Sequence, residues 1–100
     1  MGLITVTDIV EECSSYESGV KVYEAVKAQL AAGEQVSLSF KGISSVSTSF
    51  VNAAFIDLLQ DFTFETIKSR LRFVDTNRAI NDGIKRRFTF EVDRMKRAVA

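Results

Sequence analysis

Hydrophobic and polar positions divide the first third of the chain into two expected elements. Apolar and polar residues alternate from residue 3 to residue 9, which predicts a first strand. Apolar residues then recur at helical spacing from Val22 to Leu30, which predicts a helix of two to four turns. Ser14 or Ser18 is expected to cap the start of this helix, and Gly33 lies where a C-terminal cap glycine belongs.

The middle of the chain repeats the strand–helix order. Val36, Leu38 and Phe40 alternate with serines, and small serines on the second face favour a strand covered on both sides. A largely apolar stretch from about Ser49 to Gln60 predicts a buried second helix.

The last third contains a strand, a helix and a further alternation. Residues 70–74 predict a strand ending near Val74, and Thr76 or Asn77 is expected to cap a third helix. Residues 88–92 alternate again and predict a short strand, after which Asp93 would cap a last short helix.

This order predicts a single small α/β domain over residues 1–100. Its architecture would be a mainly parallel four-stranded sheet packed with three to four helices. We find no linker, low-complexity tract or internal repeat in the 100 residues.

Composition excludes several classes of chemistry. The chain has no His and a single Cys, Cys13, so it can form no Ser-His-Asp or Cys-His unit, no imidazole metal site and no internal disulfide. The glycines form neither a dinucleotide-binding nor a phosphate-binding loop motif. We therefore expect a protein that is not an enzyme and holds no cofactor or metal. Asp57 and Asp61 lie four residues apart but lack the companion groups of a catalytic pair.

The amino-acid composition also indicates the cellular compartment. The lone cysteine favours a reducing cytoplasm. No apolar run is long enough to span a membrane, and residues 1–5 lack the basic start of a signal peptide, so we expect no membrane association.

The formal net charge of zero conceals a division between the two ends of the chain. Residues 1–61 carry three basic and eight acidic residues, a net charge of −5, whereas residues 62–100 carry ten basic and five acidic residues, a net charge of +5. Such asymmetry indicates either an anionic partner for the basic part or two surfaces that neutralise one another in the fold. The basic stretches at residues 85–87 and 94–97 make a nucleic-acid or anionic-ligand binding module the alternative function. Without aromatic–basic recognition motifs, however, nucleic acid is not the expected partner.

The densest polar chemistry lies between the second strand and the second helix. Residues 44–49 contain five hydroxyl side chains in six positions. A phosphate on Thr48 or Ser47 would sit beside a helix start and gain roughly 0.3–1 kcal/mol from the helix dipole. The other interpretation is that Ser47 or Ser49 only caps the helix and that its neighbours fill a turn.

The same segment resembles a known family. Val36–Ile43 followed by Val46–Ser49 is similar to the central motif of STAS domains, the anti-sigma factor antagonist fold. Val46–Phe50 is closer to the STAS-like domains of unknown function, and the tail from Gly83 through residues 88–92 to Asp93 is similar to the STAS ending.

The resemblance implies a regulatory signalling module that acts through protein–protein contacts. It places Thr48 at the phosphoacceptor position, with Ser47 and Ser49 as neighbouring candidates. Ser47 stands where the family usually has Asp, and Phe50 where it often has Gly. The implied partner is a histidine-kinase-like ATPase or another anti-sigma-type protein. The resemblance also implies that phosphorylation would end the binding of this partner. The candidate partner-binding residues are Ser44, Ser45, Phe50 and Asn52.

Overall fold

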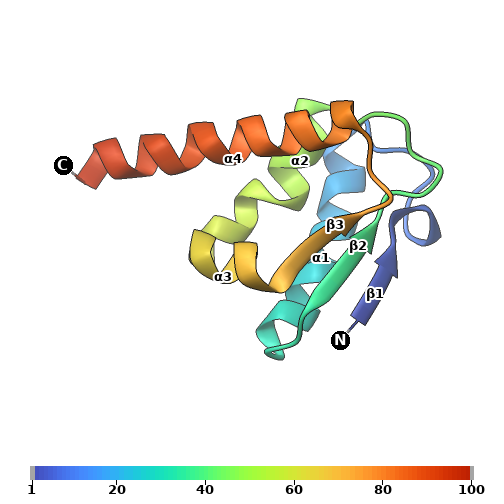
Figure 1. The fold of residues 1–100 in the computed structure, drawn as a ribbon, viewed down its shortest axis with the longest axis horizontal. Coiled ribbons are helices and arrows are strands. Elements are labelled where there is room, and N and C mark those ends of the chain that lie inside the picture. The colour runs from blue at the N-terminus through green and yellow to red at the C-terminus, as the bar shows by residue number, and fades with distance from the viewer. Residues whose placement is uncertain (1, 100) are drawn as a thin grey trace.

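A computed structural model describes residues 2–99 and the side chains of residues 2–97; Met1 and Ala100, the ends of the predicted domain, lie outside the described residues. The elements follow one another along the chain as in Figure 1. In order they are β1 (Gly2–Thr5), the 3-10 helix η1 (Val6–Asp8), α1 (Tyr16–Ala31), β2 (Val36–Ser39), α2 (Thr48–Ala54), the 3-10 helix η2 (Ile56–Gln60), α3 (Phe64–Arg70), β3 (Leu71–Val74) and α4 (Arg78–Val99).

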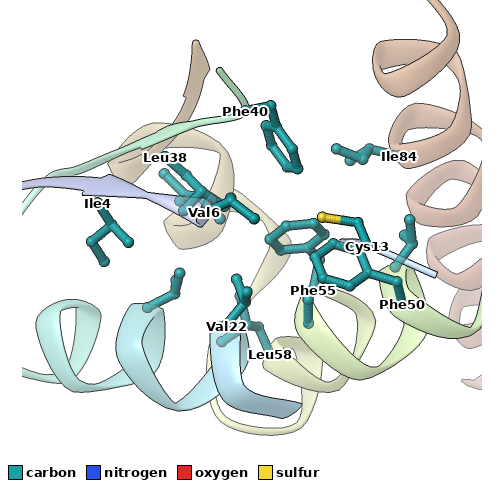
Figure 2. Close-up of a cluster of buried hydrophobic side chains, with 14 of the residues drawn as sticks. Ile4, Val6, Cys13, Val22, Leu38, Phe40, Phe50, Phe55, Leu58 and Ile84 are labelled. Atoms are coloured by element: carbon teal, nitrogen blue, oxygen red, sulfur yellow. The ribbon is translucent and has the colours of Figure 1, made fainter. Parts of the chain in front are cut away.

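Within residues 2–99 the strands form one parallel sheet in the order β1-β2-β3. Ile4 pairs with Leu38, and Leu38 pairs with Phe73, so these side chains form one row across the sheet. The row faces α1 and α2, and Figure 2 shows Ile4 and Leu38 on the side of the sheet where Val22 and Leu58 lie. The hydrophobic core therefore occupies the space between the sheet and these helices.

Aromatic rings fill the centre of this core. Phe40, Phe50 and Phe55 are fully buried. The Phe55 ring centroid lies 5.1 Å from that of Phe73 and 6.0 Å from that of Phe50, both in edge-to-face geometry. Each fully buried side chain of this size contributes about 1.5–3 kcal/mol relative to exposure, so the aromatic cluster joins α2 firmly to the sheet.

The opposite face of the sheet differs from the expectation of a strand covered on both sides. In the row formed by Leu3, Ser37 and Arg72, Leu3 is 69% exposed and Arg72 is exposed. Ser37 is half-buried. The prediction holds only at the end of the strand, where Ser39 on this same face is 4% exposed.

The predicted fourth strand at residues 88–92 is also wrong, and the described residues form three strands. Residues 88–92 lie inside α4, so Asp93 is an interior helical residue and not a cap. Phe88 and Val92 continue the four-residue spacing of Ile80 and Ile84, while Phe90 lies against the Arg87 guanidinium, 5.2 Å from the ring centroid. Phe88 and Val92 fit both the strand alternation and the helical stripe, whereas Phe90 fits only the alternation, and the longer helical stripe prevails.

Several other boundaries differ from the sequence predictions. The first strand ends at Thr5 and continues as η1, and the helix predicted from Ser49 to Gln60 divides into α2 and η2. The N-cap of α1 is Ser15, whose hydroxyl accepts a hydrogen bond from the amide of Ser18, so neither Ser14 nor Ser18 is the cap. α3 was not predicted.

The strand at β3 and the cap at Asn77 are confirmed. β3 ends at Val74. The Asn77 side chain accepts a hydrogen bond from the amide of Ile80 at 2.9 Å, which satisfies a free donor in the first turn of α4.

Two glycine-to-alanine substitutions test the packing between α1 and α2. A Cβ on Gly19 would lie 2.6 Å from the carbonyl oxygen of Phe50, whereas one on Gly83 in α4 would make an ordinary 3.6 Å contact with Val46. We expect Gly19→Ala to lower the free energy of unfolding by about 1–3 kcal/mol. We expect Gly83→Ala, the matched control, to raise it by roughly 0.5–1 kcal/mol through helix propensity. Urea denaturation measures both, and equal effects would contradict the close helix contact.

Candidate functional site

The candidate site lies at the carboxyl edge of the sheet. Because the three described strands are parallel, the segments that follow them emerge at the same edge (Figure 1). These segments are η1 after β1, residues 40–47 after β2 and residues 75–77 after β3. Such edges are the usual binding surfaces of open α/β sheets.

The segment of residues 44–49, here called the hydroxyl loop, is tied down through backbone atoms. The amide of Ser47 donates to the carbonyl of Cys13 at 2.9 Å. The carbonyl of Ser44 accepts from the side-chain amide of Asn77, also at 2.9 Å. The loop is therefore joined on one side to the residues before α1 and on the other to the start of α4.

Ser47 is the N-cap of α2. Its hydroxyl accepts a hydrogen bond from the amide of Phe50 at 3.0 Å, and its backbone is extended. The interpretation that Ser47 caps the helix is thus confirmed, while Ser49 lies inside the first turn. The hydroxyl of Thr48, the first residue of α2, has no such structural task in the described contacts, and both Thr48 and Ser49 are exposed.

The four predicted partner-binding residues differ in their exposure to solvent. Ser44 and Ser45 are exposed on the hydroxyl loop. Phe50 is fully buried in the aromatic core, so it does not belong to a contact surface. Asn52 is half-buried and accepts a hydrogen bond from Nε of Arg87 at 2.8 Å, which joins α2 to α4.

A second polar pair at this edge escaped the sequence reasoning. The hydroxyl of Ser39, which is 4% exposed, donates to the carboxylate of Asp75 at 2.6 Å and accepts from the amide of Lys41 at 3.3 Å. Asp75 adopts a positive φ of 55°, a conformation that short polar side chains tolerate. The pair adds a side-chain link between the end of β2 and the residue that follows β3. The only sign of this hydrogen-bonded pair in the sequence is a serine at an otherwise apolar strand end.

Cys13 is a structural residue at this edge. Its side chain is 3% exposed, and burial, followed by the charge of Glu12, raises the pKa of the thiol to about 11. A thiol of this kind is protonated at neutral pH and is not a nucleophile.

Asp61, which lies four residues after Asp57 in the sequence, is bound by two side chains of α1. Asp61 accepts a hydrogen bond from the Tyr23 hydroxyl at 2.8 Å and pairs with the Lys27 ammonium at 3.1 Å. Those two partners lower the pKa of Asp61. Among residues 2–99 no group of three His, Cys, Asp or Glu side chains is arranged to hold a metal ion.

The charged residues of α4 pair mainly with one another. Glu91 contacts Arg87 at 3.0 Å and Arg94 at 3.4 Å, and Arg78 lies 4.0 Å from Asp82. The other described ion pair, Lys27 with Asp61, lies within the acidic part of the chain. The described side chains thus show no ion pair between the −5 and +5 parts.

A parallel sheet with helices on one face and a strand–hydroxyl loop–helix at its carboxyl edge defines a small α/β domain of the STAS-like class. Residues 18–81 match the family model described as "STAS-like domain of unknown function (DUF4325)", and the chain belongs to this family. The resemblance expected from residues 36–50 is thereby confirmed. No curated protein and no solved structure matches the chain. No helix among residues 2–99 is long and apolar enough to cross a membrane.

The tether between Asn77 and Ser44 can be separated from the helix cap. Asn77→Asp keeps the acceptor for the Ile80 amide but loses the donor to Ser44. We expect faster amide hydrogen exchange in residues 41–46 with a loss of unfolding free energy below about 1 kcal/mol. Asn77→Ala also removes the cap and should cost about 1 kcal/mol more. Wild-type exchange rates in Asn77→Asp would refute the tether.

The raised pKa of Cys13 makes a prediction about pH. The unfolded thiol ionises near its ordinary pKa of 9.0 and the folded thiol near 11. Since the folded pKa is the higher one, the contribution of the Cys13 thiol to the free energy of unfolding is complete below pH 9. This contribution is lost as the pH rises towards 11. The native protein should contain about a hundredfold less thiolate than the unfolded chain at pH 8. Iodoacetamide labelling with and without urea measures this, and similar rates would contradict burial of the thiol.

Proposed function

We propose that this domain is a non-enzymatic regulatory module of the cytoplasm that binds a protein partner through the hydroxyl loop. The observation that supports the proposal best is the combination of a fixed backbone with exposed hydroxyls. Ser44 and Ser47 are held through backbone atoms, while the side chains of Ser45, Thr48 and Ser49 face solvent. Rigid loops with exposed polar groups suit recognition because little ordering entropy is lost on binding.

Phosphorylation of Thr48 is the proposed switch. Thr48 is favoured over Ser47 because the Ser47 oxygen already accepts the Phe50 amide. A phosphate would add a charge of about −1.5 to −2 to a surface built from neutral hydroxyls. A partner surface that fits the neutral loop would then bury this charge without a counter-charge. Removing an unpaired charge from water costs free energy, which disfavours binding.

The proposed partner is a histidine-kinase-like ATPase or a related anti-sigma-type protein. Its support is the likeness of Val36–Ile43 and Val46–Ser49 to the central motif of STAS domains, together with the family to which the chain belongs.

Phosphorylation is tested by incubating the purified chain with ATP and a candidate ATPase and measuring intact mass. We expect one added phosphate in the wild type and in Ser49→Ala, and none in Thr48→Val, which preserves the side-chain shape without the hydroxyl. Peptide mapping then locates the phosphate. Absence of phosphate from Ser47, Thr48 and Ser49 would exclude the switch.

Binding is measured separately with the unmodified chain. We expect Thr48→Glu to weaken the complex about tenfold, equivalent to roughly 1.4 kcal/mol, and Thr48→Val to leave it nearly unchanged. If both variants bind like the wild type, the hydroxyl loop is not the contact surface.

A further inference from the structure

β3 forms an open edge of the sheet. It is the last strand in the order β1-β2-β3, and Figure 1 shows it on the side of the sheet nearest to α3 and α4. The amide of Phe40 donates to the carbonyl of Val74 at 3.0 Å, so the backbone groups of Val74 and Arg72 face β2. By the alternation of a strand, the amide and carbonyl of Phe73 face away from β2, where no strand among residues 2–99 pairs with them. Such an edge can accept a further strand.

A groove of about 450 Å³ lies along this edge and is here called the β3 groove. Its apolar lining comes from α3, β3 and α4 and consists of Phe64, Ile67, Leu71, Phe73, Ile84 and Phe88. The ring centroids of Phe64 and Phe88 lie 5.6 Å apart, which joins the α3 side of the groove to the α4 side. Phe73 belongs to both the open edge and the groove lining. A strand paired with the Phe73 backbone would therefore place alternate side chains in the groove.

The charged side chains that line the β3 groove are both basic. Lys68 of α3 and Lys85 of α4 are exposed, and neither takes part in an ion pair among the described side chains. Arg72, which is exposed on the opposite face of β3, also has no ion pair in that part of the chain. A strand beside β3 would thus meet positive charge on both of its faces.

The acidic residues of this region do not cancel that charge. Residues 64–89, which contain all residues of the groove lining, carry seven basic and three acidic residues, a net charge of +4. Of the three acids, Asp75 accepts a hydrogen bond from a serine and Asp82 pairs with an arginine, both within the chain. The third, Glu65, does not line the groove. The charge of the groove is therefore complementary to an acidic ligand.

We propose that the β3 groove binds an extended, acidic segment of a partner protein, which joins the sheet as a further strand beside β3. The backbone of this segment would pair with Phe73, and its apolar side chains would fill the groove. Its carboxylates would meet Lys68, Lys85 and Arg72. In this mode of recognition the main-chain hydrogen bonds provide affinity and the alternate side chains provide specificity. The groove contains no residue of the hydroxyl loop, so the inference does not rest on the proposed function.

The first test measures binding of synthetic peptides to the full chain by fluorescence anisotropy at physiological salt. For a peptide of alternating valine and glutamate we expect a dissociation constant of micromolar order. A peptide of alternating valine and lysine should bind at least about tenfold more weakly. Absence of binding of the glutamate peptide up to about 1 mM would overturn the proposal, as would equal affinities for the two peptides.

Charge reversal on α4 locates the site. Lys85→Glu should raise the dissociation constant of the glutamate peptide about tenfold. Arg86→Glu is the matched control, because Arg86 is the next residue of α4 and does not line the groove. It should change the constant less than about twofold, since the Debye length of about 8 Å screens the effect of net charge. Thermal melting checks that both variants fold, and equal effects of the two would place the peptide elsewhere.

Amide hydrogen exchange tests the pairing with β3. In the free chain the Phe73 amide should exchange faster than the Arg72 amide, which faces β2, and saturation with the glutamate peptide should slow it at least about tenfold. Unchanged exchange at Phe73 would overturn the proposal. Exchange that slows with chain concentration in the absence of peptide would also overturn it, because a second copy of the chain would then pair with this edge.

Peptides with methylated backbone nitrogens test whether the bound segment is a strand. One peptide carries the methyl groups on all valine amides and the other on all glutamate amides. Because alternate amides of a strand point to opposite sides, one set faces β3 whichever way the segment runs. One peptide should therefore lose binding and the other retain it. Loss by both peptides, or retention by both, would contradict strand addition.

Discussion

The close approach of α1 and α2 at Gly19 determines where the rest of the fold can lie. With only hydrogen on the Gly19 Cα, the backbone of α2 at Phe50 comes within a distance that any side chain would prevent. This contact turns Phe50 and Phe55 into the space beneath the sheet, where the aromatic core forms. It also brings the start of α2 beside the residues before α1, so that the Ser47 amide can reach the Cys13 carbonyl.

Packing on one face limits how much of α4 the chain can cover. A parallel sheet usually has helices on both faces, but here Leu3 and Arg72 on the second face remain exposed. The core is therefore a single layer between the sheet and the helices, and α4 covers its end. Beyond Phe88 the side chains of α4 are no longer fully buried by the core, although the apolar spacing continues to Val92 and Met95. The groove between α4 and the segment of η2 and α3, which Leu59, Phe62, Val92 and Met95 line, is a consequence of this shortage of packing surface.

The sequence predicted those elements whose signals are local. The β2 and β3 alternations and the Asn77 cap are read within a few residues, and the structure contains all three. The strand predicted at residues 88–92 is wrong because Phe88 and Val92 fit both a strand alternation and a helical stripe. Which of the two forms depends on the distant residues that Phe88 contacts. α3 was not predicted because Ile67 is the only buried residue among its seven, and one residue makes no helical pattern. The bonds from Ser39 to Asp75 and from Asn77 to Ser44 join residues more than 30 positions apart, so no local pattern reveals them.

The way the hydroxyl loop is held explains why its side chains are available for recognition. A loop fixed by its own hydroxyls would lose its shape whenever a hydroxyl bound a partner or was modified. Here the anchors are the Ser44 carbonyl, the Ser47 amide and the Ser47 cap, and the remaining hydroxyls are exposed. Changes at Thr48 can therefore alter the chemistry of the surface while its backbone stays in place. Ser47 is the exception, since modification of its oxygen would also remove the cap of α2.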